Sequence, residues 1–175
     1  MPQFVNDGLS LHYEVHGTGR PVLLLHGGTV SFAGNYAAFG WIERLTAQGL
    51  QVIGLDFRGH GKSDKPHETS AYGTGPMAGD VIALLDHLGI NRASFVGYSI
   101  GSAIALHVLH TYRERTDRSV LIATGDGLIG IPPYTFAEVN PRVLNALRYT
   151  EFPRDLPPHV SAYWTFATKV GGDRI

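Results

Sequence analysis

The sequence contains no cysteine, which excludes disulfide bonds and thiolate metal sites. It also lacks an excess of either charge, because 14 Lys and Arg residues stand against 15 Asp and Glu residues. Neither a nucleic-acid backbone nor an anionic membrane surface is therefore predicted as a partner. No apolar run approaches the roughly 20 residues of a membrane span, and the N-terminus lacks a signal-peptide pattern. We expect a cytoplasmic protein, and 175 residues with 43% hydrophobic content suit a single packed core.

Apolar runs alternate with helical patterns along the first 123 residues. Asp7-Gly8, a dipeptide that suits a tight hairpin turn, joins extended segments over 4–6 and 9–15. Continuous apolar runs predict parallel strands that are covered on both faces. These strands are expected over 21–26, 51–55, 93–97 and 119–123, with helices over 36–48, 77–88 and 100–112. The fold class is therefore α/β, with an N-terminal hairpin followed by a mostly parallel sheet.

The pattern changes after residue 124, where proline and glycine break the chain into short pieces. Two amphipathic stretches, 141–149 and 159–170, predict helices of the kind that cover an active site. We therefore predict an α/β core over residues 1–128 and the start of a helical lid over 129–175.

The segment GYSIG at 97–101 matches the pattern G-x-S-x-G, in which the serine occupies a sharp strand-to-helix turn. Gly97 and Gly101 suit this turn because a side chain at either position would collide across it. The segment follows an apolar strand and opens a helix that begins with small residues, which is the context the motif requires. Ser99 is therefore predicted to be a nucleophile, the alternative being a purely structural glycine-rich turn.

The segment LLLHGG at 23–28 directly follows a predicted buried strand. Glycines there let backbone N–H groups point into a site, and a tetrahedral oxyanion needs two such donors. The N–H groups of Gly28 and Ile100 are the predicted pair. A plain strand-to-loop turn is the alternative interpretation.

Three segments together resemble the α/β-hydrolase superfamily, in particular its lid-bearing esterase, lactonase and C–C-bond hydrolase branch. They are LLLHGG at 23–28, DFRGHGKSDKP at 56–66 and GYSIGSA at 97–103, in the family's order. The resemblance covers about residues 4–123 and implies Ser99 as nucleophile with Gly28 and Ile100 as oxyanion-hole residues. It implies no cofactor and no metal, and a small-molecule ester as substrate.

The resemblance also implies that the loop at 56–64 shapes the site from below. Asp56, Arg58 and Asp64 are then structural residues, and His60 is not a catalytic base. The other histidines of the first 123 residues, on the N-terminal hairpin and on two helices, are expected at the surface without a metal; they include His12, His16, His87, His107 and His110.

A serine hydroxyl needs a base to take its proton, and the base needs an orienting acid. In the family the order is Ser, acid, His, and the usual acid and His have no counterpart here, so the fold is predicted to be C-terminally incomplete. Asp126 follows a predicted strand where some relatives place the acid, although 125–127 also suits a plain turn. His159 is the candidate base, although its place after two prolines also suits the start of a helix.

The predicted reaction is cleavage of carboxylic esters through an acyl-enzyme on Ser99. A cofactor-free lactone or C–C-bond hydrolase is one alternative, and a catalytically inactive ligand-binding remnant without the triad His is another. A serine rather than an aspartate at the turn argues against epoxide hydrolase or dehalogenase chemistry. If 175 residues are the whole product, the strand at 119–123 would form an exposed apolar edge, which predicts a homodimer through that edge. The alternative is that the apolar lid residues Tyr163, Trp164 and Phe166 cover it.

Overall fold

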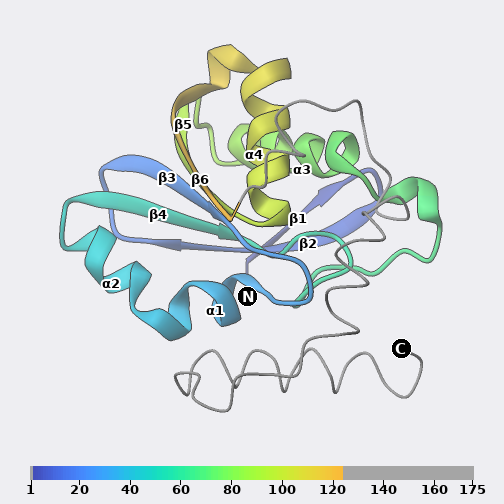
Figure 1. Ribbon diagram of the computed structural model, residues 1–175, viewed down its shortest axis with the longest axis horizontal. Coiled ribbons are helices and arrows are strands. Elements are labelled where there is room, and N and C mark those ends of the chain that lie inside the picture. The colour runs from blue at the N-terminus through green and yellow to red at the C-terminus, as the bar shows by residue number, and fades with distance from the viewer. Residues whose placement is uncertain (1, 124–175) are drawn as a thin grey trace, which may run out of the picture. The chain divides into compact units, whose positions relative to one another are not determined.

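The computed structural model describes residues 2–123, and these residues form a six-stranded sheet with helices on both faces (Figure 1). The strand order is β1-β2-β4-β3-β5-β6. Neighbours from β4 onward are parallel, whereas β2 runs antiparallel to both β1 and β4. The strands are β1 Gln3–Asn6, β2 Leu9–His16, β3 Arg20–Leu25, β4 Leu50–Leu55, β5 Ala93–Tyr98 and β6 Thr116–Ile122. The predicted hairpin followed by a mostly parallel sheet is confirmed.

The two long helices agree with the predictions within a few residues. They are α3, Thr74–His87, and α4, Ile100–Thr111. The single helix predicted over 36–48 is wrong. The chain forms two short pieces in that range and a third just before it. Gly40, left-handed with φ 71°, ends one piece and starts the next. The pieces are α1 Phe32–Asn35, η1 Ala37–Phe39 and α2 Trp41–Thr46.

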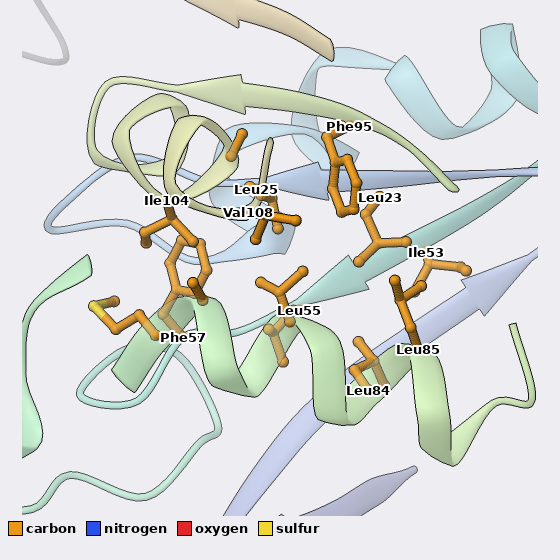
Figure 2. Packing of buried hydrophobic residues seen from close by; sticks show 14 of the residues in the cluster. Leu23, Leu25, Ile53, Leu55, Phe57, Leu84, Leu85, Phe95, Ile104 and Val108 are labelled. Atoms are coloured by element: carbon orange, nitrogen blue, oxygen red, sulfur yellow. The ribbon is translucent and has the colours of Figure 1, made fainter. Parts of the chain in front are cut away.

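The central strands β3, β4 and β5 bury both of their faces, which explains their continuous apolar runs. Side chains alternate between the two faces of a strand, so neighbouring residues join different clusters. Figure 2 shows the cluster on the α3–α4 face, which includes Leu23, Leu25, Ile53, Leu55, Phe57, Leu84, Leu85, Phe95, Ile104 and Val108. The cluster on the opposite face contains Val22, Leu24, Val52 and Val96 together with Phe32 and Tyr36.

A buried ion pair joins the loop after β4 to α3. The Arg58 guanidinium donates to both carboxylate oxygens of Asp80, at 2.7 and 2.6 Å, and both side chains are almost fully buried. Arg58 also donates to the carbonyl of Ala71 at 3.0 Å, and Asn6 donates to Asp80 at 2.7 Å. Further partners of this kind are what a buried charge pair requires. The pair therefore connects the N-terminal hairpin, the loop and α3.

Several predictions concern residues beyond 123 and lie outside the described part of the chain. These are the boundary between core and lid at 128–129 and the two lid helices. Pairing of two copies along β6 stays a prediction. In the part of the chain from residue 2 to 123, no helix is both long and apolar enough to cross a membrane.

Replacing Asp80 by alanine is expected to lower the free energy of unfolding by about 3–5 kcal/mol, because Arg58 would remain buried with only the exposed carboxylate of Asp7, 3.5 Å away, as a counter-charge. Urea denaturation measures this change. Asp86 is the matched control, since it pairs with Arg115 at 2.6 Å but is 63% exposed. Asp86→Ala is expected to cost less than about 1 kcal/mol. Equal losses in the two variants would contradict the structural role of the buried pair.

Candidate active site

Ser99 lies in the turn between β5 and α4 with φ 53° and ψ −115°, a conformation that residues other than glycine rarely adopt. Its N–H donates to the carbonyl of Ile122 at 2.9 Å, and its carbonyl accepts the N–H of Ser102 at 2.9 Å. Backbone strain of this kind persists only where the surroundings hold it in place. Because the residue is exposed, the turn presents the serine at the surface of the described part of the chain.

Gly97 and Gly101 leave no space for a side chain, as the motif predicted. A Cβ atom on Gly97 would lie 2.5 Å from the carbonyl oxygen of Gly101. A Cβ atom on Gly101 would overlap the carbonyl of Leu25 and lie 2.7 Å from that of His26. The absence of both side chains lets the first turn of α4 approach the end of β3.

Ser102 fastens the turn to the neighbouring strand β6. Its buried hydroxyl lies 2.7 Å from the carbonyl oxygen of Gly97 and 2.8 Å from that of Ile122. It also accepts the N–H of Ile122 at 3.1 Å. The sequence identified Ser102 only as a small residue, because its partner on β6 is 20 positions away.

Gly28 and Ile100, the predicted oxyanion donors, lie next to each other. A Cβ atom on Gly28 would be 4.0 Å from Cγ2 of Ile100. Ile100 is the first residue of α4, where an N–H has no acceptor within the helix. Neither N–H donates to a backbone acceptor among residues 2–123. Their role as donors to an oxyanion stays a prediction.

His26 is a fully buried residue that holds the loop after β3. Its Nδ1 lies 2.6 Å from the carbonyl oxygen of Gly27, and its Nε2 lies 3.1 Å from the N–H of Phe57. Both contacts are satisfied by a neutral ring with its proton on Nδ1. Burial lowers the pKa of His26 from 6.5 to about 4, although the hydrogen bond to Gly27 opposes this shift. His26 is therefore a neutral structural residue, a function that the sequence did not indicate.

Asp56 connects three segments below the site. Its carboxylate accepts the N–H groups of Phe32 and Lys62, both at 2.9 Å, and lies 3.1 Å from Nδ1 of His12. The expectation that His12 lies at the surface is wrong, because it is only 2% exposed beneath this loop. These contacts agree with the structural role that the family resemblance implies for the loop.

Tyr36 joins the ends of the two strands that carry the predicted site. Its buried hydroxyl lies 3.1 Å from the carbonyl oxygens of both Leu25 on β3 and Val96 on β5. Burial raises the pKa of this hydroxyl, so it stays a proton donor. Its partners are 11 and 60 residues away, and no local pattern in the sequence indicates them.

The predicted acid Asp126 and base His159 lie outside the described residues. Between residues 2 and 123, no group of three or more His, Asp or Glu side chains is arranged to hold a metal ion. The resemblance excluded His60 as a base. Its Nδ1 atom lies 3.1 Å from the carbonyl oxygen of Arg58.

Comparison with known proteins identifies related sequences. The family model described as the alpha/beta hydrolase fold matches residues 20–169. An AB hydrolase superfamily protein of Bacillus subtilis, YisY, is 37% identical over 119 residues, which is 67% of this chain and 42% of that protein. A soluble epoxide hydrolase of Corynebacterium sp. is 31% identical over 129 residues, or 73% of this chain and 42% of the relative.

Solved structures share the same fold. Est816, described as an N-acyl homoserine lactone degrading enzyme, matches with a TM-score of 0.65 and 32% identity over 85% of this chain and 52% of its own. An epoxide hydrolase mutant from Vigna radiata matches with a TM-score of 0.66 and 26% identity, over 70% of this chain and 38% of its own. This chain thus spans less than half the length of the two curated relatives. It spans about half or less of the length of the two chains in the solved structures.

Gly101→Ala is expected to lower the free energy of unfolding by about 2–3 kcal/mol, because the new methyl group would overlap the carbonyl of Leu25. Gly79→Ala in α3 is the control, since a Cβ atom there meets nothing within 4 Å. The control is expected to gain about 0.5–1 kcal/mol from the higher helix propensity of alanine. Stabilisation of both variants in chemical denaturation would show that the close approach at Gly101 does not exist.

Acidification is expected to destabilise the protein through His26. Its pKa is near 6.5 when unfolded and about 4 when folded, so between these values the unfolded chain binds more protons. The stability that neutral His26 contributes is present above pH 6.5 and is lost progressively as the pH falls to 4, about 3 kcal/mol in all. Urea denaturation at several pH values across this range should show that the free energy of unfolding changes more with pH for the wild type than for His26→Gln. Parallel pH profiles would contradict the buried neutral ring.

Proposed function

We propose, since the chain belongs to the alpha/beta hydrolase fold family, that it carries the nucleophile of a serine hydrolase that cleaves carboxylic esters. The observation that supports this most directly is Ser99, which is exposed in a strained turn between β5 and α4. A second support is the pair of N–H groups of Gly28 and Ile100 beside it, which donate to no backbone acceptor among residues 2–123.

In the proposed reaction, Ser99 Oγ attacks the ester carbonyl carbon while its proton passes to a general base. The carbonyl oxygen becomes an oxyanion, which accepts hydrogen bonds from the N–H groups of Gly28 and Ile100. The alcohol then leaves with a proton, and water hydrolyses the acyl-enzyme. His159 is the proposed base and Asp126 its proposed acid, both on the sequence argument alone.

The serine at the turn separates this proposal from the chemistry named for two relatives. Both the Corynebacterium and the Vigna radiata proteins are named as epoxide hydrolases. An aspartate at the turn is the expected nucleophile for opening an epoxide, whereas Ser99 forms an acyl ester from a carbonyl substrate. An epoxide is therefore not the substrate we propose.

Lactone hydrolysis is the second candidate, because a lactone is a cyclic ester and needs the same nucleophile and oxyanion donors. It is supported by the lactone-degrading relative, which is 32% identical and matches 85% of this chain. A third candidate is a protein that binds a ligand without turnover.

The test is hydrolysis of p-nitrophenyl acetate by the purified chain, compared with Ser99→Ala and with Ser70→Ala, an exposed serine in η2 (Thr69–Ala71), as the control. Ser99→Ala is expected to lower kcat/KM by about 10³-fold or more, and the control to leave it unchanged. Mass spectrometry should find the acyl group on Ser99 in the wild type.

The same variants assayed with an N-acyl homoserine lactone distinguish the first two candidates. A higher kcat/KM for the lactone than for open-chain esters would favour lactone hydrolysis over hydrolysis of open-chain esters. Equal rates for wild type and Ser99→Ala on both substrates would contradict both hydrolase proposals and leave the binding protein.

A further inference from the structure

Side chains hold Gly27 from both sides. Its N–H donates to Oδ1 of Asn35 at 2.8 Å, and its carbonyl oxygen accepts Nδ1–H of His26 at 2.6 Å. His26 follows the last residue of β3, whereas Asn35 is the last residue of α1, so the two contacts come from different elements. The backbone of Gly27 is therefore fixed at both of its peptide groups.

The second of these peptide groups contains the N–H of Gly28. In a trans peptide the carbonyl and the following N–H point in opposite directions, and residues 2–123 contain no cis peptide. While His26 holds the carbonyl of Gly27, the N–H of Gly28 must point away from the His26 ring. This constraint orients the donor that lies beside Ile100.

Asn35 can act as an anchor because α1 is itself fastened at its start. Ser31 caps the helix by accepting the N–H of Gly34 at 3.2 Å, and Asp56 accepts the N–H of Phe32 at 2.9 Å. The N–H of Asn35 donates to the carbonyl of Ser31 at 2.9 Å. The amide oxygen of Asn35 is thus presented from a short helix that is held at its N-terminal end.

The ring of Tyr98 closes the remaining space at Gly27. A Cβ atom on Gly27 would lie 2.9 Å from Cδ1 of Tyr98 and 3.5 Å from Oδ1 of Asn35. Tyr98 is the residue before Ser99, so the loop after β3 and the turn that carries the serine are in direct contact. A shift of Gly27 would therefore change the distance between Ser99 and the N–H of Gly28.

We propose that Asn35 is a positioning residue which, together with His26, holds the N–H of Gly28 in place for the oxyanion. This inference rests on the proposed function. The Asn35 side chain does not enter the reaction; it acts through Gly27. Loss of its acceptor is expected to weaken stabilisation of the transition state more than binding of the substrate.

The test compares Asn35→Leu, which removes the acceptor at similar volume, with Asn35→Asp, which keeps a carboxylate oxygen there. With p-nitrophenyl acetate, Asn35→Leu is expected to lower kcat by roughly 10–100-fold while KM changes less than about 2-fold. Asn35→Asp should stay within about 3-fold of the wild type. Asn91→Leu, in an exposed loop, is the control for a leucine that replaces asparagine.

A second measurement, amide hydrogen exchange by NMR on the same chain, does not depend on turnover. Asn35→Leu is expected to raise the exchange rate of the Gly27 amide at least about 10-fold relative to amides of β3, and Asn35→Asp to restore protection. Unchanged exchange at Gly27 in Asn35→Leu would overturn the inference, whether or not the chain hydrolyses esters.

The two measurements separate the inference from the proposed function. If Ser99→Ala keeps full activity, the proposed function fails, and the exchange experiment alone decides whether Asn35 holds Gly27. If Ser99→Ala is inactive but Asn35→Leu keeps the wild-type kcat, the positioning role is wrong and the hydrolase proposal stands.

Discussion

The arrangement of the site depends on the contact between Gly101 and the end of β3. Only a residue without a side chain allows the first turn of α4 to lie against the carbonyls of Leu25 and His26. This approach requires the chain to turn sharply after β5, and the turn is made at Ser99, whose φ is 53°. The same approach places Ile100 beside Gly28, so one steric constraint brings the predicted nucleophile and both predicted donors together.

Polar side chains that are buried or partly buried then hold this arrangement. Tyr36 joins the ends of β3 and β5, Ser102 joins the turn to β6, and His26 and Asn35 hold Gly27. A polar group that is buried without a partner destabilises a protein, but satisfied groups define one geometry. Donors that are already oriented before the substrate binds need no rearrangement during the reaction, and this is the condition under which an oxyanion hole is effective.

Local patterns predicted most of the fold because they depend on residues close in sequence. The apolar runs identified β3, β4 and β5, and G-x-S-x-G identified the turn at Ser99. The prediction of one helix over 36–48 was wrong because the helical spacing of apolar residues continues through Gly40. The sequence alone does not show whether a glycine in such a pattern adopts a helical or a left-handed φ. The polar contacts could not be predicted because their partners are far apart in sequence. His12 and Asp56 are 44 residues apart and Tyr36 and Val96 are 60 apart, so only the folded chain brings them together.

The structure also narrows the search for the base. Nε2 of His26 already accepts the N–H of Phe57, and burial lowers its pKa to about 4, so protonating it during turnover would be unfavourable. His60 belongs to the loop that Asp56 organises, and its Nδ1 contacts the carbonyl of Arg58. A base must be free to take a proton from serine, which the burial of His26 disfavours, and the family resemblance assigns no base to the loop that carries His60. Since His159 is the one histidine after residue 123 in the sequence, a test of the base from this chain begins with His159.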